Sequence, residues 1–137
     1  MKATESDSNT IVDVAVGVVT HGDGRVLLAE RPQGKPSAGY WEFPGGKFES
    51  NENPREALAR ELHEELGVEL DAAYPWITRI HRYPHMTVRL HIYRVLRWHG
   101  EPHGRESQRL SWEDPHAVGV APLLPANHDI LQALILP

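Results

Sequence analysis

Six glutamates gather in one short stretch of this chain: Glu49, Glu52, Glu56, Glu61, Glu64 and Glu65. The last three are spaced i, i+3 and i+4, so they would share one face of a helix. Carboxylates that converge on one point favour a hard cation, and oxygen ligands in that number suit Mg²⁺ or Mn²⁺. The plainer interpretation is a solvated acidic helix face, because runs of charge usually face water.

The signals that begin and end a helix surround this cluster. Asn53 is a good N-cap, Pro54 suits the first helical position, and Glu56 lies three residues after the cap, as in a capping box. Gly67 supplies the left-handed residue that ends many helices. The sequence therefore predicts a helix over residues 54–66. Its leucines form a second stripe, which should face the core: Leu58, Leu62 and Leu66.

The fixed positions of this stretch belong to one longer pattern. Gly46 is followed by five residues and Glu52, and then by seven residues and the string RELHEELGV at 60–68. The pattern matches the Nudix box at every fixed position over 23 residues. The chain thus resembles the Nudix hydrolases, which cleave nucleoside diphosphates linked to another group. The resemblance implies an α/β Nudix fold, in which a mixed β-sheet lies between the box helix and a C-terminal helix (α/β/α).

The resemblance also implies roles for residues of the box. The implied metal ligands, for Mg²⁺ or alternatively Mn²⁺, are the carbonyl of Gly45 and the carboxylates of Glu61, Glu64 and Glu65. Arg60 would orient Glu61 and pair with Glu52. The glutamate that takes the proton from the attacking water stays open among Glu61, Glu65 and Glu106. Asn51 departs from the glycine of close relatives, but asparagine tolerates the left-handed conformation.

Two segments outside the box resemble MutT-type members of the family. The string GEPHGRE at 100–106 resembles a loop that supplies another glutamate near the metals, so Glu106 is the implied additional ligand. The alternative is an exposed loop acid. Pro125-Ala126-Asn127 matches the place where these enzymes present an asparagine to an oxidised guanine. An amide offers a donor and an acceptor together, which suits recognition of a purine edge.

Three more residues are candidates for binding the substrate. Arg31 follows a strand, at the place where relatives contact the nucleotide, although it could also be a surface cation. Phe43 is either a core residue or a wall of the base pocket. Lys47 either points at phosphate or pairs with Glu49.

The resemblance implies a Mg²⁺-dependent nucleoside triphosphate pyrophosphohydrolase that releases a nucleoside monophosphate and pyrophosphate. The expected substrate is an oxidised purine nucleotide such as 8-oxo-dGTP. Met86 stands near a position where a basic residue lies beside the base pocket in MutT-type enzymes, so a pyrimidine triphosphate such as CTP remains the alternative. A non-catalytic nucleotide-binding module is a further alternative. Such modules typically lose box glutamates, and here all of them are present: Glu52, Glu61, Glu64 and Glu65.

Local patterns before the box indicate strands and turns. Residues 11–21 are β-branched and nearly all apolar, which predicts a strand buried on both faces. Gly22-Asp23-Gly24 is a turn signal, and residues 25–31 should return as the second strand of a hairpin. A Pro/Gly/Ser loop follows, and residues 41–44 form a short strand that leads into the glycine pair.

Local patterns after the box indicate a sheet and a final helix. Residues 69–75 are expected to be a connection. Residues 76–84 and 86–98 alternate apolar with polar side chains, which predicts two neighbouring half-buried strands. An apolar-periodic run then predicts a helix over roughly 127–135, with Asn127 as its N-cap.

Composition bounds the remaining possibilities. The 137 residues should form one domain, with residues 1–9 as a flexible polar lead. A net charge of −5 argues against a nucleic-acid polymer as partner, but not against a small-molecule nucleotide that arrives with Mg²⁺. The absence of cysteine excludes disulfides and thiolate chemistry, and the histidine spacing matches no zinc motif. No signal peptide or membrane-spanning run is visible, so we expect a cytoplasmic protein without a membrane partner. The sequence does not indicate an oligomeric state.

Overall fold

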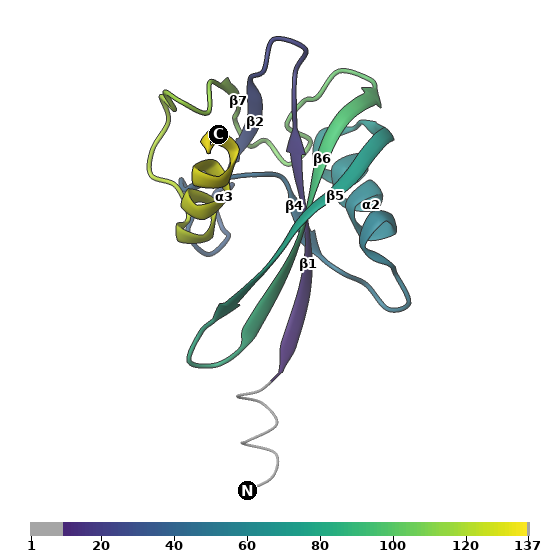
Figure 1. The fold of residues 1–137 in the computed structure, drawn as a ribbon, viewed down its shortest axis with the longest axis vertical. Helices are drawn as coiled ribbons and strands as arrows, with labels where there is room; N and C mark the ends of the chain where they lie inside the picture. Colours follow the sequence, from purple (N-terminus) through teal and green to yellow (C-terminus); the bar gives the residue numbers. More distant parts are fainter. Residues whose placement is uncertain (1–9, 137) are drawn as a thin grey trace, which may run out of the picture.

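The computed structural model describes residues 10–136, so the expectation for the polar lead, residues 1–9, lies outside the described residues. Strands form the centre of the molecule, and the two helices α2 (Pro54–Leu66) and α3 (Pro125–Ile135) lie on opposite sides of them (Figure 1). The expected α/β/α arrangement is confirmed. Within residues 10–136, neither helix has the length and apolar character needed to cross a membrane.

The strands form two sheets rather than the single sheet expected. The first sheet is mixed: β1 and β6 run parallel, whereas the pairs β1–β4 and β5–β6 are antiparallel. Its order is β4 (Gly45–Lys47), β1 (Ile11–Val19), β6 (Thr87–His99) and β5 (Glu69–Arg82). The second sheet is antiparallel, in the order β3 (Trp41–Glu42), β2 (Val26–Glu30) and β7 (Leu110–Glu113).

Alternating side chains of β1 contribute to two separate cores. Successive residues of a strand point to opposite faces, so Val16 and Val18 pack in the core that contains Ile130 of α3. Ala15 and Val19 pack on the other side, in the core that contains the three buried leucines of α2. The second half of β1 is therefore buried on both faces as predicted, whereas its first residue is half exposed. The strand links the two helical layers.

The prediction of a hairpin over residues 11–31 is wrong, because only its turn and one bridge form and the two strands belong to different sheets. The turn itself forms, since the N–H of His21 donates to the carbonyl of Arg25 at 2.8 Å. Past it, Thr20 and Val26 form a single antiparallel bridge and the two strands separate. Both edges of β1 are already occupied by β4 and β6, so β2 pairs with β3 and β7 instead.

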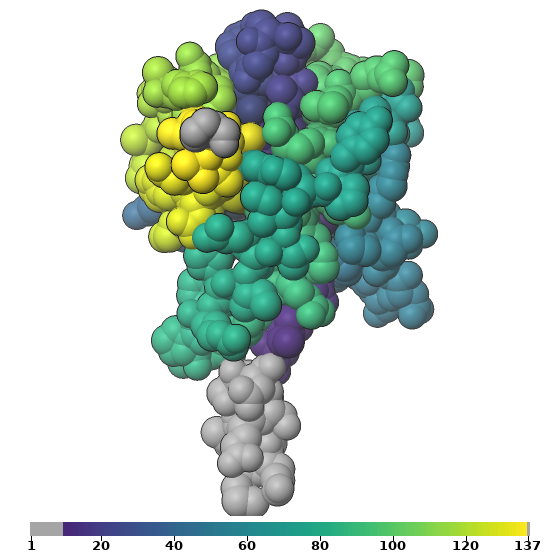
Figure 2. Space-filling model, in the orientation of Figure 1, coloured from purple at the N-terminus to yellow at the C-terminus, as the bar shows by residue number. Residues whose placement is uncertain are grey.

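Residues 69–75, expected to be a connection, are the first half of β5, so this expectation is also wrong. Glu69 pairs with His99 at the far end of β6, and the strands remain antiparallel neighbours along their length. Pro75 lacks an N–H for the ladder, and a register shift between Pro75 and Ile77 accommodates it. The predicted pairing of the two long strands is confirmed. Side chains of β5 also meet α3 at the surface (Figure 2), where Arg79 lies 3.1 Å from Asp129.

The predicted ends of α2 are confirmed. Asn53 accepts a hydrogen bond from the N–H of Glu56, and the Glu56 side chain accepts one from the N–H of Asn53, which completes the capping box. Gly67 ends the helix with φ 71°. Asn51 has φ 66°, the left-handed conformation expected of it.

The predicted start of the last helix is wrong. Helix α3 begins at Pro125, and its N-cap is Leu124, which has no side chain able to cap. Asn127 lies inside the first turn, and its Oδ1 accepts a hydrogen bond from the backbone N–H of Phe43 at 2.9 Å. The Asn127 side chain is thus bonded to a residue 84 positions away in sequence and does not cap the helix.

Candidate active site

A cavity of about 540 Å³ lies between the sheets and the two helices. On the α3 side its wall is apolar, with Phe43, Leu90 and Ile130 among the lining residues. On the α2 side the lining includes Glu61 and Glu65. One cavity thus joins an apolar surface to a group of carboxylates.

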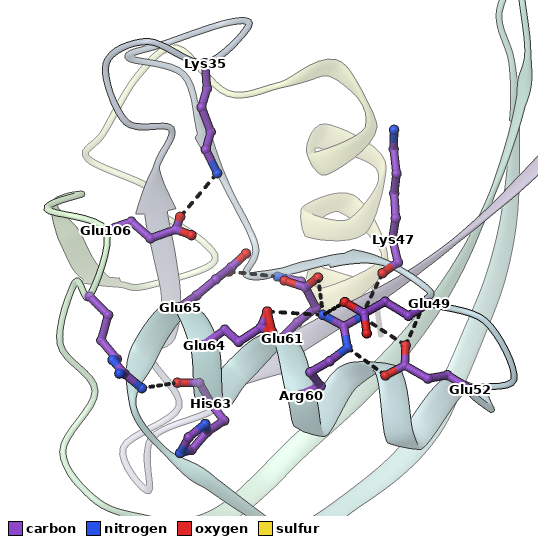
Figure 3. A network of polar contacts seen from close by, with 12 residues as sticks. Lys35, Lys47, Glu49, Glu52, Arg60, Glu61, His63, Glu64, Glu65 and Glu106 are labelled. Carbon is purple, nitrogen blue, oxygen red and sulfur yellow. Dashed lines mark hydrogen bonds and ion pairs between the residues drawn. The ribbon is translucent and has the colours of Figure 1, made fainter.

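Arg60 is the centre of the polar network on α2 (Figure 3). Its Nε and Nη2 donate to the two carboxylate oxygens of Glu52 at 2.6 and 3.0 Å. Its Nη1 donates to Glu61 at 3.0 Å and to Glu64 at 3.2 Å. Its Nη2 also donates to the carbonyl of Lys47 at 2.9 Å, which ties the helix to β4. The planar guanidinium, with donors pointing in several directions, lets one residue hold three carboxylates and a strand.

Glu65 is a box glutamate whose surroundings strongly disfavour its ionised form. Burial raises the pKa of its carboxyl to about 9, and the negative charges of Glu61, Glu42 and Glu106 act in the same direction. The N–H of Gly45 lies 3.4 Å from Glu65 Oε1 and is a weak donor to it. Burial and the neighbouring carboxylates therefore both disfavour the ionised form of Glu65.

The glycine pair allows the close approach of helix and strand. A Cβ on Gly46 would lie 2.4 Å from Cδ of Glu61, so only glycine leaves that carboxylate its place. At Gly45, φ is 154° and a Cβ would lie 2.0 Å from the carbonyl oxygen of Ala15. Gly45 thus allows the backbone to pack closely against β1, and Gly46 leaves space for the carboxylate of Glu61.

The donor chemistry here fits a hard divalent cation. The candidate ligands are all oxygen donors, and besides burial the neighbouring carboxylates of Glu61, Glu42 and Glu106 help to raise the pKa of Glu65. In residues 10–136, however, no three His, Asp or Glu side chains form a ready-made metal site. The carboxylates of Glu61 and Glu64 are instead paired with Arg60.

Glu106 reaches the same cavity from the loop that precedes β7. Its carboxylate lies 3.5 Å from Nζ of Lys35, which extends from the loop between β2 and β3. Its negative charge contributes to the raised pKa of Glu65. The structure therefore brings Glu106 close to the box glutamates, although 41 positions separate it from Glu65.

The remaining sequence candidates also line this cavity. Arg31 pairs with Glu42 at 3.1 Å, so its guanidinium is held at the wall rather than free on the surface. Phe43 is 3% exposed and belongs to the core as well as to the lining. Lys47 extends away from the glutamates (Figure 3), while Glu49, its other expected partner, lies 3.5 Å from Arg60.

Sequence reasoning did not single out several polar residues of the cavity, among them Lys35, Glu42 and Gln108. Burial raises the pKa of Glu42 even though Arg31 lies beside it. Glu42 stands next to Phe43-Pro44-Gly45-Gly46, and that proximity was a usable signal. Lys35 and Gln108 lie in loops whose local patterns carry no indication of where the loops fold.

Comparisons with known proteins agree with this arrangement. Residues 15–133 match a family model described as NUDIX domain. An 8-oxo-dGTP diphosphatase of Haemophilus influenzae is 36% identical over 125 residues, which cover 91% of this chain and 92% of that protein. A CTP pyrophosphohydrolase of Escherichia coli is 38% identical over 120 residues, which cover 88% and 89%. The solution structure of the E. coli ORF135 protein superposes with a TM-score of 0.81 at 36% identity, covering 93% of this chain and 91% of that one.

Proposed function

The chain belongs to the Nudix hydrolase family, and from that premise we propose that it is a Mg²⁺-dependent nucleoside triphosphate pyrophosphohydrolase whose preferred substrate is an oxidised purine nucleotide such as 8-oxo-dGTP. One observation carries the proposal. A single cavity has box carboxylates on one side and, on the other, an apolar wall that holds the amide of Asn127. Its volume of about 540 Å³ is within the range of small-molecule sites.

The carboxylate side would bind the polyphosphate and activate water. The groups that would hold Mg²⁺ are the Gly45 carbonyl and the carboxylates of Glu61, Glu64, Glu65 and Glu106. When bound, Mg²⁺ neutralises phosphate oxygens and lowers the pKa of a coordinated water. Arg31 and Lys47 place positive charge along the same cavity, which favours the anionic substrate. A glutamate accepts the proton of the attacking water, and Glu61, Glu65 and Glu106 are the candidates.

The expected products follow from the bond that breaks. Attack of water on the β-phosphorus breaks its bond to the oxygen bridging to the α-phosphorus. The nucleoside monophosphate leaves with that oxygen, and pyrophosphate carries the oxygen from water. Arg60 takes no direct part in this step, since its donors are engaged by Glu52, Glu61 and Glu64. Its proposed role is to keep Glu61 in place.

The apolar side would bind the base. The hydrogen bond from the Phe43 N–H fixes the orientation of the Asn127 amide, so that its Oδ1 and Nδ2 are distinguished. Nδ2 lies 3.5 Å from the carbonyl of Leu124, a weak contact that leaves donor capacity for a base edge. Val88 and Leu90 of β6 supply part of the surrounding apolar wall.

A pyrimidine triphosphate is the second candidate substrate. The relative named CTP pyrophosphohydrolase is 38% identical, which is as high as the identity to the relative named 8-oxo-dGTP diphosphatase, at 36%. An asparagine amide can pair with the edge of cytosine as well as with that of a purine.

The test is a substrate panel with Mg²⁺: 8-oxo-dGTP, dGTP, dCTP, CTP and ADP-ribose, with initial rates and the release of pyrophosphate or orthophosphate measured. We expect kcat/KM for 8-oxo-dGTP to exceed that for dGTP, with pyrophosphate as the product. A preference for CTP or dCTP would retain the hydrolase and reject the purine assignment. No turnover of any compound would favour a nucleotide-binding module without catalysis.

Two variants test the residues behind the proposal. Asn127→Asp keeps an acceptor for the Phe43 N–H but removes the Nδ2 donor, so it should reduce discrimination between substrates more than it reduces stability. Glu64→Gln removes one implied metal ligand and should reduce kcat strongly. Undiminished hydrolysis by Glu64→Gln would mean that the metal site is assigned to the wrong residues.

A further inference from the structure

The loop that carries Glu106 caps the carboxyl end of α2. The last carbonyls of a helix have no partner within the helix and need donors from elsewhere. The N–H of His103 donates to the carbonyl of Leu66, and the N–H of Arg105 donates to that of Glu65, each at 3.1 Å. Nη1 of Arg105 donates to the carbonyl of His63 at 3.0 Å. The loop is thus fixed to the helix that bears the box glutamates.

Gln108 completes this cap and joins it to Glu106. Its side chain is buried, with 8% of the residue exposed. Nε2 donates to the carbonyl of Glu65 at 3.1 Å, and Oε1 accepts a hydrogen bond from the N–H of Glu106 at 2.8 Å. The two ends of one amide therefore contact the backbones of two glutamates, and both of those glutamates face the cavity.

The local chain path is built around this side chain. Ser107 has φ 64° and donates its N–H to the carbonyl of Gly104 at 3.0 Å, so the loop makes a tight turn there. A Cβ on Gly104 would lie 2.0 Å from the carbonyl oxygen of Gln108 and 3.0 Å from its Oε1. The turn folds Gln108 back beneath Glu106, where its amide can reach α2.

We propose that Gln108 is a positioning residue: it holds the backbone of Glu106 against the end of α2, so that the Glu106 carboxylate stays beside Glu65 at the cavity. The inference rests on the proposed function, because it gives Gln108 a role through Glu106. A neutral amide is suited to the task, since it supplies one donor and one acceptor without adding charge to an already acidic site.

The other contact of Glu106 is a weaker anchor. The Lys35 ammonium lies 3.5 Å away, and the side chains of the pair are 52% and 38% exposed. Exposed ion pairs contribute little to holding a structure, because water and salt screen them. The hydrogen bonds of the buried Gln108 side chain, rather than the Lys35 ion pair, therefore fix where the Glu106 backbone lies.

A double-mutant cycle between Gln108 and Glu106 tests this role. Gln108→Met keeps the length of the side chain and removes both hydrogen bonds, and Glu106→Gln removes the carboxylate that Gln108 is proposed to position. Mutation of a residue that orients a metal ligand typically lowers activity or metal affinity about 10–100-fold. We expect Gln108→Met to lower kcat/KM by about that factor in the wild-type background, and by less than about threefold in the Glu106→Gln background. The exposed Gln132→Met is the matched control and should leave kcat/KM unchanged.

An equal loss in both backgrounds would overturn the proposal, because a general packing defect does not depend on Glu106. A second readout is the affinity for Mn²⁺ alone, measured by electron paramagnetic resonance without nucleotide. Gln108→Met should weaken Mn²⁺ binding about as much as Glu106→Gln does, and the double variant no further. Unchanged Mn²⁺ affinity in Gln108→Met would also overturn the positioning role.

The two proposals can fail separately. If the wild-type protein hydrolyses no nucleoside triphosphate, the proposed function fails, and the Mn²⁺ titration still decides the role of Gln108. If Gln108→Met does not fold, Gln108→Asn keeps a neutral amide but is one methylene shorter, so it cannot contact the backbones of Glu106 and Glu65 together. The cycle with Glu106→Gln is then measured with that variant and interpreted in the same way.

Discussion

Substitution of Arg60 by lysine keeps the charge of the side chain but removes the fork of donors. The guanidinium holds Glu52 through two hydrogen bonds of 2.6 and 3.0 Å, and it holds Glu61 through a third of 3.0 Å. These carboxylates keep the pKa of Arg60 above its ordinary value. A single ammonium nitrogen cannot span both glutamates and also reach the carbonyl of Lys47, so at least two of these contacts should be lost.

The expected loss of stability follows from how buried the partners are. The side chains of Arg60, Glu52 and Glu61 are 20%, 15% and 16% exposed, so their contacts are screened only in part. Hydrogen bonds to charged groups contribute about 1.5–3 kcal/mol each. Because lysine retains the charge and one contact, we expect a loss of about 2 kcal/mol. For a chain of this length, 1 kcal/mol shifts Tm by about 3–4 °C, so Tm should fall by about 7 °C.

The measurements are urea unfolding of Arg60→Lys without metal and initial rates with Mg²⁺. Displacement of Glu61 should also lower kcat/KM about 10–100-fold. Arg55→Lys is the matched control on the same helix, because the Arg55 side chain donates an exposed hydrogen bond of 2.7 Å to the carbonyl of Asp71 and contacts none of the box glutamates among the described residues. That control should lose less than about 0.5 kcal/mol. If Arg60→Lys has the same stability to urea and the same kcat/KM as Arg55→Lys, the guanidinium does not organise the glutamates and the reasoning is refuted.

Two further predictions concern β1 and the glycine pair. The hydrogen bonds from Arg89 lower the pKa of Asp13 from 3.8 to about 2, so its ionised form stabilises the folded protein above pH 3.8 and that stability is lost as pH falls towards 2. After discount for screening, Asp13→Asn should lose about 1 kcal/mol at pH 7, and acid titration of unfolding should show the difference vanishing near pH 2. Gly46→Ala should displace Glu61 and lower kcat with little change in Tm, whereas Gly45→Ala should lower Tm because its Cβ would meet a backbone oxygen of β1. Equal effects of the two glycine variants on Tm would contradict this division of roles.

The ends of α2 show how far local sequence reaches. Asn53, Glu56 and Gly67 act on backbone groups only a few residues away, so their types and spacing were sufficient to predict both ends of the helix. The ion pair between Arg60 and Glu52 was expected from the family resemblance, and the structure contains it. These contacts span eight residues or fewer, and Glu52 lies just before the N-cap of the helix that carries Arg60.

Two of the errors occurred where distant segments competed for the same strand edge or the same side chain. Residues 11–31 have the pattern of a hairpin, but β4 and β6 occupy both edges of β1 and leave β2 no place beside it. Asn127 has the local pattern of an N-cap, but its side chain accepts a hydrogen bond from the N–H of Phe43, 84 residues away. Local propensity could not reveal either competitor, because each is brought near only by the completed sheets.

The sequence by itself determined the box helix, its caps and the acidic face that points to metal chemistry, since short-range backbone geometry fixes all three. Only the tertiary structure decided that burial would raise the pKa of Glu65. The approach of Glu106 was implied by the family resemblance, but no local pattern shows which contacts hold its loop in place. The tertiary structure also decided that the amide of Gln108 would lie between the backbones of Glu65 and Glu106. The physical reason is that burial and hydrogen bonding between loops depend on which elements pack together, and a chain acquires that information only as the whole fold forms.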